Sequence, residues 1–551
     1  MAFFSKITGV DYPWPKYAQI TIKDYAGGAM ENTTATMHND LAQQDAREFV
    51  DENKWEETIA HELFHHWFGD YVTAESWSNL TLNESFAKYS EALWYEYKYG
   101  KDEGEAANFR SLRDYLSDSA DIAKNLVRFY YNDKEDVFDN VTYPKGAHIL
   151  HMLRNYVGDS AFFKSLHLFL VTNKFKSAEA QNLRLAFEEV TGQDLNWFWN
   201  QWYYGSGHPK LDINYGFDSA SKTAKVFIKQ TQAGKIFKLP IAIDVYGDNQ
   251  KKRYKVWIER ISDTFSFPIN SKPELVNVDA DKMLICEKTD HKTLENYIYQ
   301  YKYAGSFIDR REAIVYAAKD QRNPVALNFL KNTMEDKSDR LRDFTINQLD
   351  IKNDTVRKFM ETTILNKAND KVSWVRTGAI MALGEFKKVE YKPLFLKALK
   401  DSSYWVSGYA LEALGKIDSV AALQQVEVLS LQPVKGYLLY SINYTIFKFS
   451  DESKFDSIAL KFDKLPFVFA GSKTHMLPSF ADFLKRVKST GNLIKGVDLI
   501  VKFREDMPLQ YHSWSDGYIN GVLTGIAEAK QAAGLKEQAD YIKSKLPVIN
   551  K

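Results

Sequence analysis

The chain has 551 residues, of which 45% are hydrophobic and 26% are charged. This composition excludes an intrinsically disordered chain, and the length predicts about three or four domains. Lys and Arg together number 72, as do Asp and Glu, so the zero net charge gives no electrostatic reason to expect nucleic acid or an anionic membrane as a partner.

Cys286 is the only cysteine, which excludes an internal disulfide and a thiolate metal cage and predicts an inert thiol. Few cysteines are typical of cytoplasmic proteins, so we expect a cytoplasmic location. A periplasmic or secreted location is the alternative if a native N-terminal region precedes this sequence. No apolar run reaches the length of about 18 residues that a membrane span needs, so we expect no membrane partner. We favour a monomer.

Residues 1–205 are predicted to form a first, mostly helical domain. Ala18 to Tyr25 alternates in hydrophobicity as a strand does, and helical periodicity dominates from there to about residue 202. Residues 206–290 change character. They contain short β-rich runs separated by turn residues, which predicts a small antiparallel β-sandwich.

Residues 291–551 are predicted to be helical and contain an internal repeat. A set of residues recurs 31 positions later: Asp370, Trp374, Val375, Ala379, Leu383 and Gly384 return as Asp401, Trp405, Val406, Ala410, Leu414 and Gly415. A weaker copy lies around Asp336, Leu341, Arg342 and Leu349. This pattern resembles HEAT or armadillo repeats, in which stacked helical pairs form one extended solenoid.

The segment HELFH, residues 61–65, is the strongest chemical signal. On a helix, His61 and His65 are four positions apart, so both imidazoles point the same way and can bind one metal ion. Glu62 is offset by about 100° and would accept a proton from metal-bound water. The alternative is a helix with two partly buried histidines, which is costly without a partner.

Catalytic zinc takes three protein ligands and an open position for water. Tyr71 stands six residues after His65, which excludes the motif with a third histidine. The nearby carboxylates are Asp70, Glu75, Glu84 and Glu91. Glu84 follows His65 after eighteen intervening residues, and Glu91 lies on the same helix face two turns later. Spacing alone therefore leaves both residues open as the third ligand.

This spacing, in the context HELFHHWFGDYVT…NESFA, resembles the gluzincin pattern of M1-family aminopeptidases. A second family motif, GAMEN, occupies residues 28–32, and residues 3–17 are similar to the family's lead-in. The resemblance implies one Zn²⁺ per chain, held by His61, His65 and Glu84, with Glu62 as the general base. It also implies a multidomain α+β fold: a thermolysin-like, mostly helical catalytic domain, a small β-sandwich and a C-terminal HEAT-like α-solenoid.

The GAMEN motif implies a substrate-binding segment made of Gly28, Ala29, Met30, Glu31 and Asn32. Glycine allows a peptide backbone to approach closely, and the preceding strand could pair with an extended substrate. By resemblance, Glu31 binds the free α-ammonium group of the first residue. The expected partner is therefore a peptide with a free N-terminus.

Residues 143–147 are similar to the family's Tyr-x-Lys-Gly-Ala, which implies that Tyr143 donates its hydroxyl to the oxyanion of the tetrahedral intermediate. Lys145 and Gly146 are expected to be structural. Two positions depart from the family pattern: Ser85 replaces a usual Gly after the third ligand, and Asp70 replaces a common Asn. We expect Asp70 to support a zinc ligand through a hydrogen bond.

Family members normally carry an N-terminal β-domain before this start, and we expect this chain to lack it. Two alternatives to an aminopeptidase remain open. One is a zinc endopeptidase, which shares HExxH but not GAMEN. The other is a binding scaffold with a catalytically incomplete peptidase-like domain.

Overall fold

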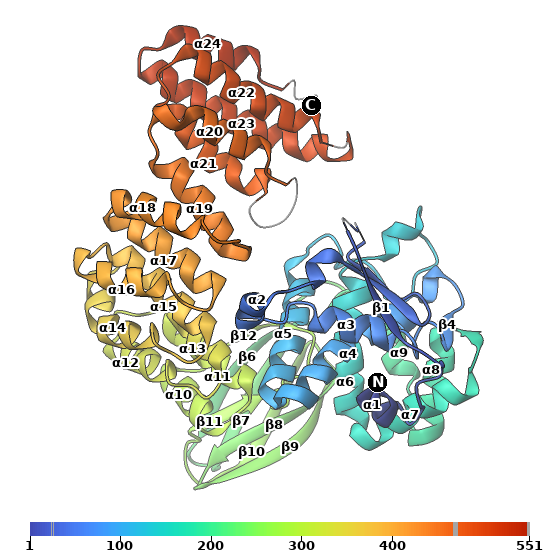
Figure 1. Cartoon of the computed structure of the whole chain (residues 1–551). Helices are drawn as coiled ribbons and strands as arrows, with labels where there is room; N and C mark the ends of the chain where they lie inside the picture. The colour runs from blue at the N-terminus through green and yellow to red at the C-terminus, as the bar shows by residue number, and fades with distance from the viewer. Residues whose placement is uncertain (24, 26, 467–471, 508, 548–551) are drawn as a thin grey trace. The chain divides into compact units, whose positions relative to one another are not determined.

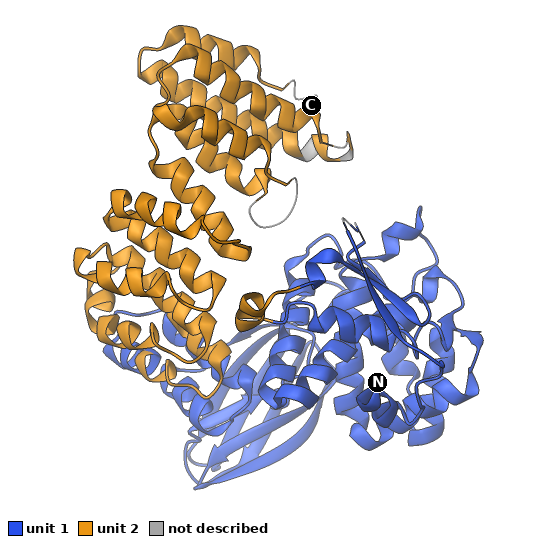
Figure 2. Ribbon diagram, viewed as in Figure 1, with its two compact units in different colours: residues 1–43, 53–330 blue, residues 44–52, 331–551 orange. Residues whose placement is uncertain are grey.

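The computed structural model describes residues 1–23, 25, 27–466, 472–507 and 509–547 (Figure 1). The chain divides into two compact units, shown in different colours in Figure 2. Unit 1 comprises residues 1–43 and 53–330, and unit 2 comprises residues 44–52 and 331–551. This division is coarser than the predicted domain boundaries after residues 205 and 290, which stay a prediction.

Unit 1 opens with one helix and a small three-stranded sheet: α1 (Ala2–Thr8), β1 (Ala18–Ile22), β2 (Ala29–Met30), β3 (Ala35–Asn39) and the 3-10 helix η1 (Asp40–Ala42). The central strand β3 pairs in parallel with β1 and antiparallel with β2. The predicted strand from Ala18 is thus present, although Asp24 lies outside the described residues.

Helices then build the first part of unit 1: α3 (Glu56–Phe64), α4 (Thr81–Tyr99), α5 (Lys101–Ser117), α6 (Gly146–Val157), α7 (Asp159–Thr172), α8 (Ala180–Thr191) and α9 (Asn196–Trp202). Shorter elements lie between them: β4 (Val72–Ala74), η2 (Trp77–Asn79), η3 (Lys134–Val137), η4 (Val141–Lys145) and β5 (Lys176–Ala178). Aromatic side chains form the core next to α3. The rings of Phe68 and Phe86 stack at 4.0 Å, and the buried Trp67 donates its indole N–H to the carbonyl of Val10 at 2.9 Å. These contacts fix α3 against α4 and the N-terminal segment.

Two sheets follow, made from β6 (Lys210–Asp218), β7 (Thr223–Gln230), β8 (Leu239–Gly247), β9 (Gln250–Ile258), β10 (Ser262–Pro268), β11 (Leu275–Val278) and β12 (Glu287–Asp290). The strand orders are β10-β7-β6-β12 and β11-β8-β9. The prediction of a purely antiparallel sandwich is wrong at one edge, because β12 pairs in parallel with β6. Burial raises the pKa of the free Cys286 thiol to about 12, so this thiol stays protonated.

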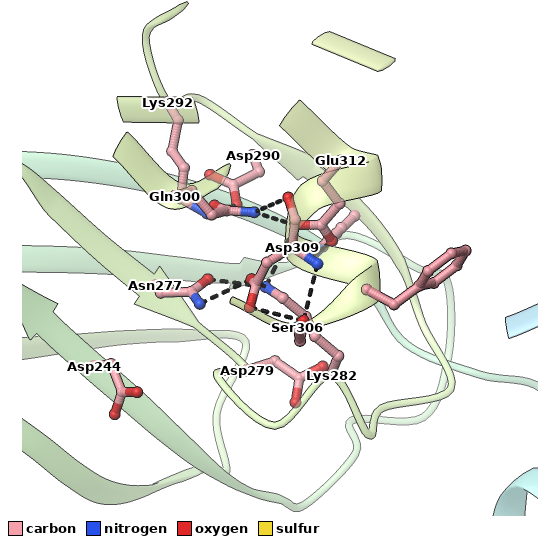
Figure 3. Close-up of polar contacts among 12 residues, drawn as sticks. Asp244, Asn277, Asp279, Lys282, Asp290, Lys292, Gln300, Ser306, Asp309 and Glu312 are labelled. Carbon is pink, nitrogen blue, oxygen red and sulfur yellow. Dashed lines mark hydrogen bonds and ion pairs between the residues drawn. The ribbon is translucent and has the colours of Figure 1, made fainter. Parts of the chain in front are cut away.

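A buried polar network attaches α10 (Leu294–Tyr303) and α11 (Phe307–Ala318) to the sheets (Figure 3). The ammonium group of Lys282 lies 3.1 Å from Asp309 and 3.3 Å from Glu312, and it donates to Asn277 at 2.8 Å. Lys292 donates to Asp290 and to Gln300, both at 2.9 Å. Removing one partner would leave a buried charge unpaired, so the network fixes these helices on the sandwich.

Helix α12 (Pro324–Thr333) crosses the boundary between the two units at residue 330. The helices that follow it in unit 2 are α13 (Asp339–Gln348), α14 (Asp354–Lys367), α15 (Ser373–Phe386), η5 (Val389–Tyr391), α16 (Lys392–Ala398), α17 (Tyr404–Ile417), α18 (Ser419–Leu429), α19 (Gly436–Phe449), η6 (Glu452–Lys454), α20 (Phe455–Asp463), α21 (Lys473–Arg486), α22 (Thr490–Glu505), η7 (Leu509–Tyr511), α23 (His512–Ala532) and α24 (Lys536–Ser544). The short helix α2 (Ala46–Asp51) also belongs to unit 2. Among the described helices, none combines the length and apolarity that crossing a membrane requires.

Candidate active site

Three predicted zinc ligands converge at the end of α3. His61 lies in the last turn of the helix, and His65 follows directly as its C-cap with helical φ and ψ. Glu84 lies in the first turn of α4. One carboxylate oxygen of Glu84 lies 3.3 Å from Nε2 of His61 and 3.3 Å from Nε2 of His65. The three ligand atoms all lie within 4.8 Å of one another, as one shared metal ion requires.

The second nitrogen of each imidazole is bound elsewhere. Nδ1–H of His61 donates to the carboxylate of Glu91 at 3.0 Å, and Nδ1–H of His65 donates to the carbonyl of Phe68 at 3.1 Å. These acceptors fix the tautomer that leaves each Nε2 free to bind a metal. The donor set of two imidazoles and one carboxylate fits zinc. The two carboxylates that the sequence left open as the third ligand take different positions. Glu84 faces Nε2 of both histidines, whereas Glu91 accepts a hydrogen bond from Nδ1–H of His61.

The electrostatics of this group favour a positive charge at its centre. Burial alone would lower the histidine pKa values, but the Glu84 and Glu91 carboxylates raise the pKa of His61 to about 9. For His65, the carboxylates of Glu84 and Glu31 likewise outweigh burial and raise its pKa to about 10. Although burial opposes its ionisation, Glu84 keeps a pKa well below its ordinary value because both imidazoles face it. A bound cation would be stabilised by the same carboxylates.

Glu62 and Glu31 form a second group with His65. Oxygen atoms of both carboxylates and a nitrogen of His65 lie within 4.8 Å of one another. Glu62 is 6% exposed, and burial raises its pKa to about 7 although His61 and His65 act against this shift. A carboxylate with such a pKa can both accept and return a proton near neutral pH.

Glu31 stands directly after β2, on the segment of the GAMEN motif. Its carboxylate lies 3.9 Å from Nδ1 of His65 and its side chain is 19% exposed, so it is open to a ligand. Gly28 has a φ of +78°, a left-handed conformation that favours glycine, and its carbonyl accepts from the N–H of Asn39 at 2.7 Å. Ala29 and Met30 pair with β3, which places Asn32 and Glu31 at the end of this short strand.

His66, which the sequence did not single out, holds this segment against α3. Its Nδ1–H donates to the carbonyl of Glu62 at 3.2 Å, and its Nε2 accepts from the N–H of Thr34 at 3.0 Å. Asp70 lies 3.8 Å from Nε2 of His66, and burial raises its pKa to about 6. Asp70 therefore faces His66, while the carbonyl of Phe68 takes the supporting position on the predicted ligand His65.

Tyr143 lies in the π-helical turn η4, over the imidazole of His61. The two rings stack with 6.1 Å between their centroids and 13° between their planes. Burial and the nearby Glu84 carboxylate raise the pKa of Tyr143 well above its ordinary value. The hydroxyl therefore stays protonated and available as a donor.

Ser85 ties α4 to the turn that carries Tyr143. Its hydroxyl donates to the carbonyl of Thr142 at 2.6 Å and lies 2.7 Å from the hydroxyl of Thr81. A Cβ on Gly146 would lie 1.9 Å from this hydroxyl, so the serine and the glycine fit one another. Lys145 is fully buried, with its ammonium group 5.2 Å from the centre of the Tyr115 ring.

Residues 1–202 match the family model of the peptidase family M1 domain, and residues 362–437 match that of HEAT repeats. Among curated proteins, "Probable aminopeptidase 1" of Sulfurisphaera tokodaii is 27% identical over 374 residues, which cover 60% of this chain and 48% of that protein. "Aminopeptidase N" of Streptomyces lividans is 34% identical over 210 residues, which cover 36% of this chain and 24% of that protein. The chain thus spans less than half the length of these relatives.

A solved structure of Legionella pneumophila aminopeptidase A, in complex with aspartic acid, is similar over 99% of this chain and 72% of its own, with a TM-score of 0.61. The sequence identity is 14%, so this similarity concerns the fold. Together with the HEAT match, it confirms the predicted fold class.

Proposed function

Since residues 1–202 belong to peptidase family M1, we propose that the chain is a zinc aminopeptidase that removes single residues from peptide N-termini. One observation carries the proposal: the carboxylates of Glu31 and Glu62 and the phenol of Tyr143 all surround the histidine–Glu84 group. The homologous proteins named as aminopeptidases support the same reaction class.

In this proposal, His61, His65 and Glu84 hold one zinc ion. When bound, zinc polarises the scissile carbonyl and lowers the pKa of water. Glu62 takes the proton from the attacking water and passes it to the leaving nitrogen. Tyr143 donates a hydrogen bond to the carbonyl oxygen as negative charge develops there. Its raised pKa supports this role, because an ionised phenol could not donate.

Glu31 gives the exopeptidase specificity in this proposal. Its partly exposed carboxylate belongs to the same group as Glu62 and His65. An α-ammonium group bound to Glu31 would therefore lie one residue away from the bond to be cut. The neighbouring residues Gly28, Ala29, Met30 and Asn32 would position the first residue of the peptide. This arrangement argues against an endopeptidase, which must accept substrates that lack a free amine.

The test is the release of a chromogenic amine from a panel of aminoacyl substrates by the purified, zinc-loaded chain. We expect chelator-sensitive turnover, and rejection of the same substrates once their amine is acetylated. Internal cleavage of acetylated peptides would favour the endopeptidase. Absence of turnover despite one bound zinc would favour the catalytically incomplete scaffold.

The variant Glu62→Gln separates binding from chemistry. It should retain zinc and lose turnover by about 100-fold or more, because the general base is removed while the ligands stay. Glu57→Gln, five residues earlier on α3, is the matched control and should keep wild-type turnover. Normal turnover by Glu62→Gln would show that another group is the base.

A further inference from the structure

Two arginines of the helical repeats close the turn before their own helix in the same way. Arg342 donates to the carbonyls of Asp336 and Lys337, at 2.9 and 3.4 Å. Arg376 donates to the carbonyls of Asp370 and Lys371, at 2.9 and 3.1 Å. Each arginine thus stands six residues after the aspartate that opens its turn.

The same arginines also join successive repeats. Arg342 binds both carboxylate oxygens of Asp370 at 3.1 Å, and Arg376 binds those of Asp401 at 2.9 and 2.8 Å. Each repeat therefore needs a guanidinium group at its turn carbonyls and an aspartate to receive the guanidinium of the previous repeat. This explains why Asp370 recurs as Asp401.

The next repeat lacks its arginine. Six residues after Asp401 stands Ser407 on α17. Of the two turn carbonyls, its short side chain reaches only that of Asp401, to which its hydroxyl donates at 3.2 Å. The turn is otherwise the same: the Asp401 carboxylate accepts from the N–H of Ser403 at 2.9 Å, as Asp370 does from that of Val372 at 3.0 Å.

A residue from a distant part of the sequence takes the vacant position. Arg47 of α2 donates to the carbonyls of Asp401 at 2.9 Å and Ser402 at 3.1 Å. These are the two carbonyls that correspond to the pair bound by Arg376 one repeat earlier. Arg47 also donates to the hydroxyl of Ser407 at 3.1 Å, and its guanidinium lies 4.1 Å from the centre of the Tyr404 ring.

A second contact fixes the other end of α2. The Asp51 carboxylate is buried and accepts from the hydroxyl of Ser403 and from the N–H groups of Tyr404 at 3.1 Å and Trp405 at 3.4 Å. These groups form the N-terminus of α17, where a negative charge is favoured. The hydroxyl of Ser373, at the start of α15, donates to the carbonyl of Val50 at 3.0 Å.

We infer that residues 44–52 are a docking element built into the chain, which completes the repeat at α17 by supplying in Arg47 the arginine that position 407 lacks. The segment belongs to unit 2, as Figure 2 shows, while the chain on both sides of it belongs to unit 1. It connects residues 28–43, which carry Glu31, to residues 53–65, which carry His61 and His65. The order of this connection therefore depends on the repeat at α17, whatever reaction the chain catalyses.

Hydrogen exchange of the full-length chain, read by mass spectrometry over residues 46–51 and 401–407, tests this inference. Arg47→Ala should speed exchange of both segments by about tenfold or more, because hydrogen bonds to a charged group are lost. Arg47→Lys keeps the charge without the two-pronged geometry and should give an intermediate increase. Unchanged exchange over 46–51 in both variants would overturn the inference.

The variant Arg47→Ala/Ser407→Arg places the arginine where the earlier repeats have it. Exchange over 401–407 should return to the wild-type rate, while residues 46–51 stay fast. Arg342→Ala removes the arginine of an earlier repeat and is the control: it should speed exchange near residues 336 and 370, which Arg342 contacts, and leave residues 46–51 and 401–407 at the wild-type rate. Fast exchange over 401–407 in the double variant would show that Arg47 does not stand in for the repeat arginine.

Discussion

The imidazole of His61 is held from both sides: its Nδ1–H donates to Glu91 at 3.0 Å, while its Nε2 faces Glu84. Burial opposes ionisation of Glu91, but Lys88 at 2.6 Å and His61 together lower the pKa of that carboxyl. Glu91 is therefore a carboxylate acceptor, which sets the tautomer and the ring orientation of His61.

Glu91→Gln should weaken zinc binding about 10- to 100-fold, because the amide is a poorer acceptor and no longer fixes Nδ1–H. Competition against a fluorescent zinc chelator measures the affinity. Glu96→Gln, on the same helix, is the matched control, since Glu96 pairs with Arg154 away from the histidines. Equal zinc affinities of Glu91→Gln and the wild type would remove Glu91 from the site.

The spacing of the sequence left Glu84 and Glu91 open as the third ligand, because both lie on one face of α4. Which of the two carboxylates faces Nε2 of the histidines depends on where α3 packs along α4. This packing cannot be read from the spacing in the sequence. The repeat could be found in the sequence because Asp370 and Asp401 have the same role. Each accepts hydrogen bonds from the arginine of the previous repeat. The role of Arg47 was not visible, since it stands over 350 positions from its partners at α17.

Tyr143→Phe should lower kcat by about 100- to 1000-fold with little change in zinc affinity, because a donor to the developing oxyanion is lost and the ligands stay. Steady-state kinetics on the best substrate of the panel measure the effect. Tyr130→Phe alters a 97% exposed tyrosine and serves as the control. A rise in KM with kcat unchanged would point instead to a role in ground-state binding.

Ser85 and Gly146 should show strong energetic coupling. Gly146→Ala places a methyl group against the Ser85 hydroxyl and should cost about 1–3 kcal/mol of unfolding free energy. In a Ser85→Gly background the hydroxyl is absent, so the same change should cost far less. Denaturant unfolding of the four proteins of this cycle gives the coupling. Additive effects would mean that the turn of Tyr143 is not packed on Ser85.

His148 should make the stability of unit 1 dependent on pH. Its ring is 2% exposed, Nε2–H donates to the carbonyl of Met283 at 3.0 Å, and Nδ1 has no hydrogen-bond partner among the described residues. Burial lowers its pKa to about 4 from an unfolded value near 6.5. The unfolded chain therefore binds more protons between these values, so stability is complete above about pH 6.5 and falls as the pH drops towards 4.

The loss of unfolding free energy caused by His148 alone should approach about 3 kcal/mol at pH 4. His148→Gln keeps a hydrogen-bond donor but does not titrate, so it should remove this loss. Unfolding free energies measured from pH 7 to pH 5 should thus fall less steeply for His148→Gln than for the wild type. Some slope should persist, because burial also lowers the pKa of His151, whose ring lies 5.4 Å away. Identical slopes for His148→Gln and the wild type would mean that His148 becomes protonated without unfolding, through an opening of the contact with Met283.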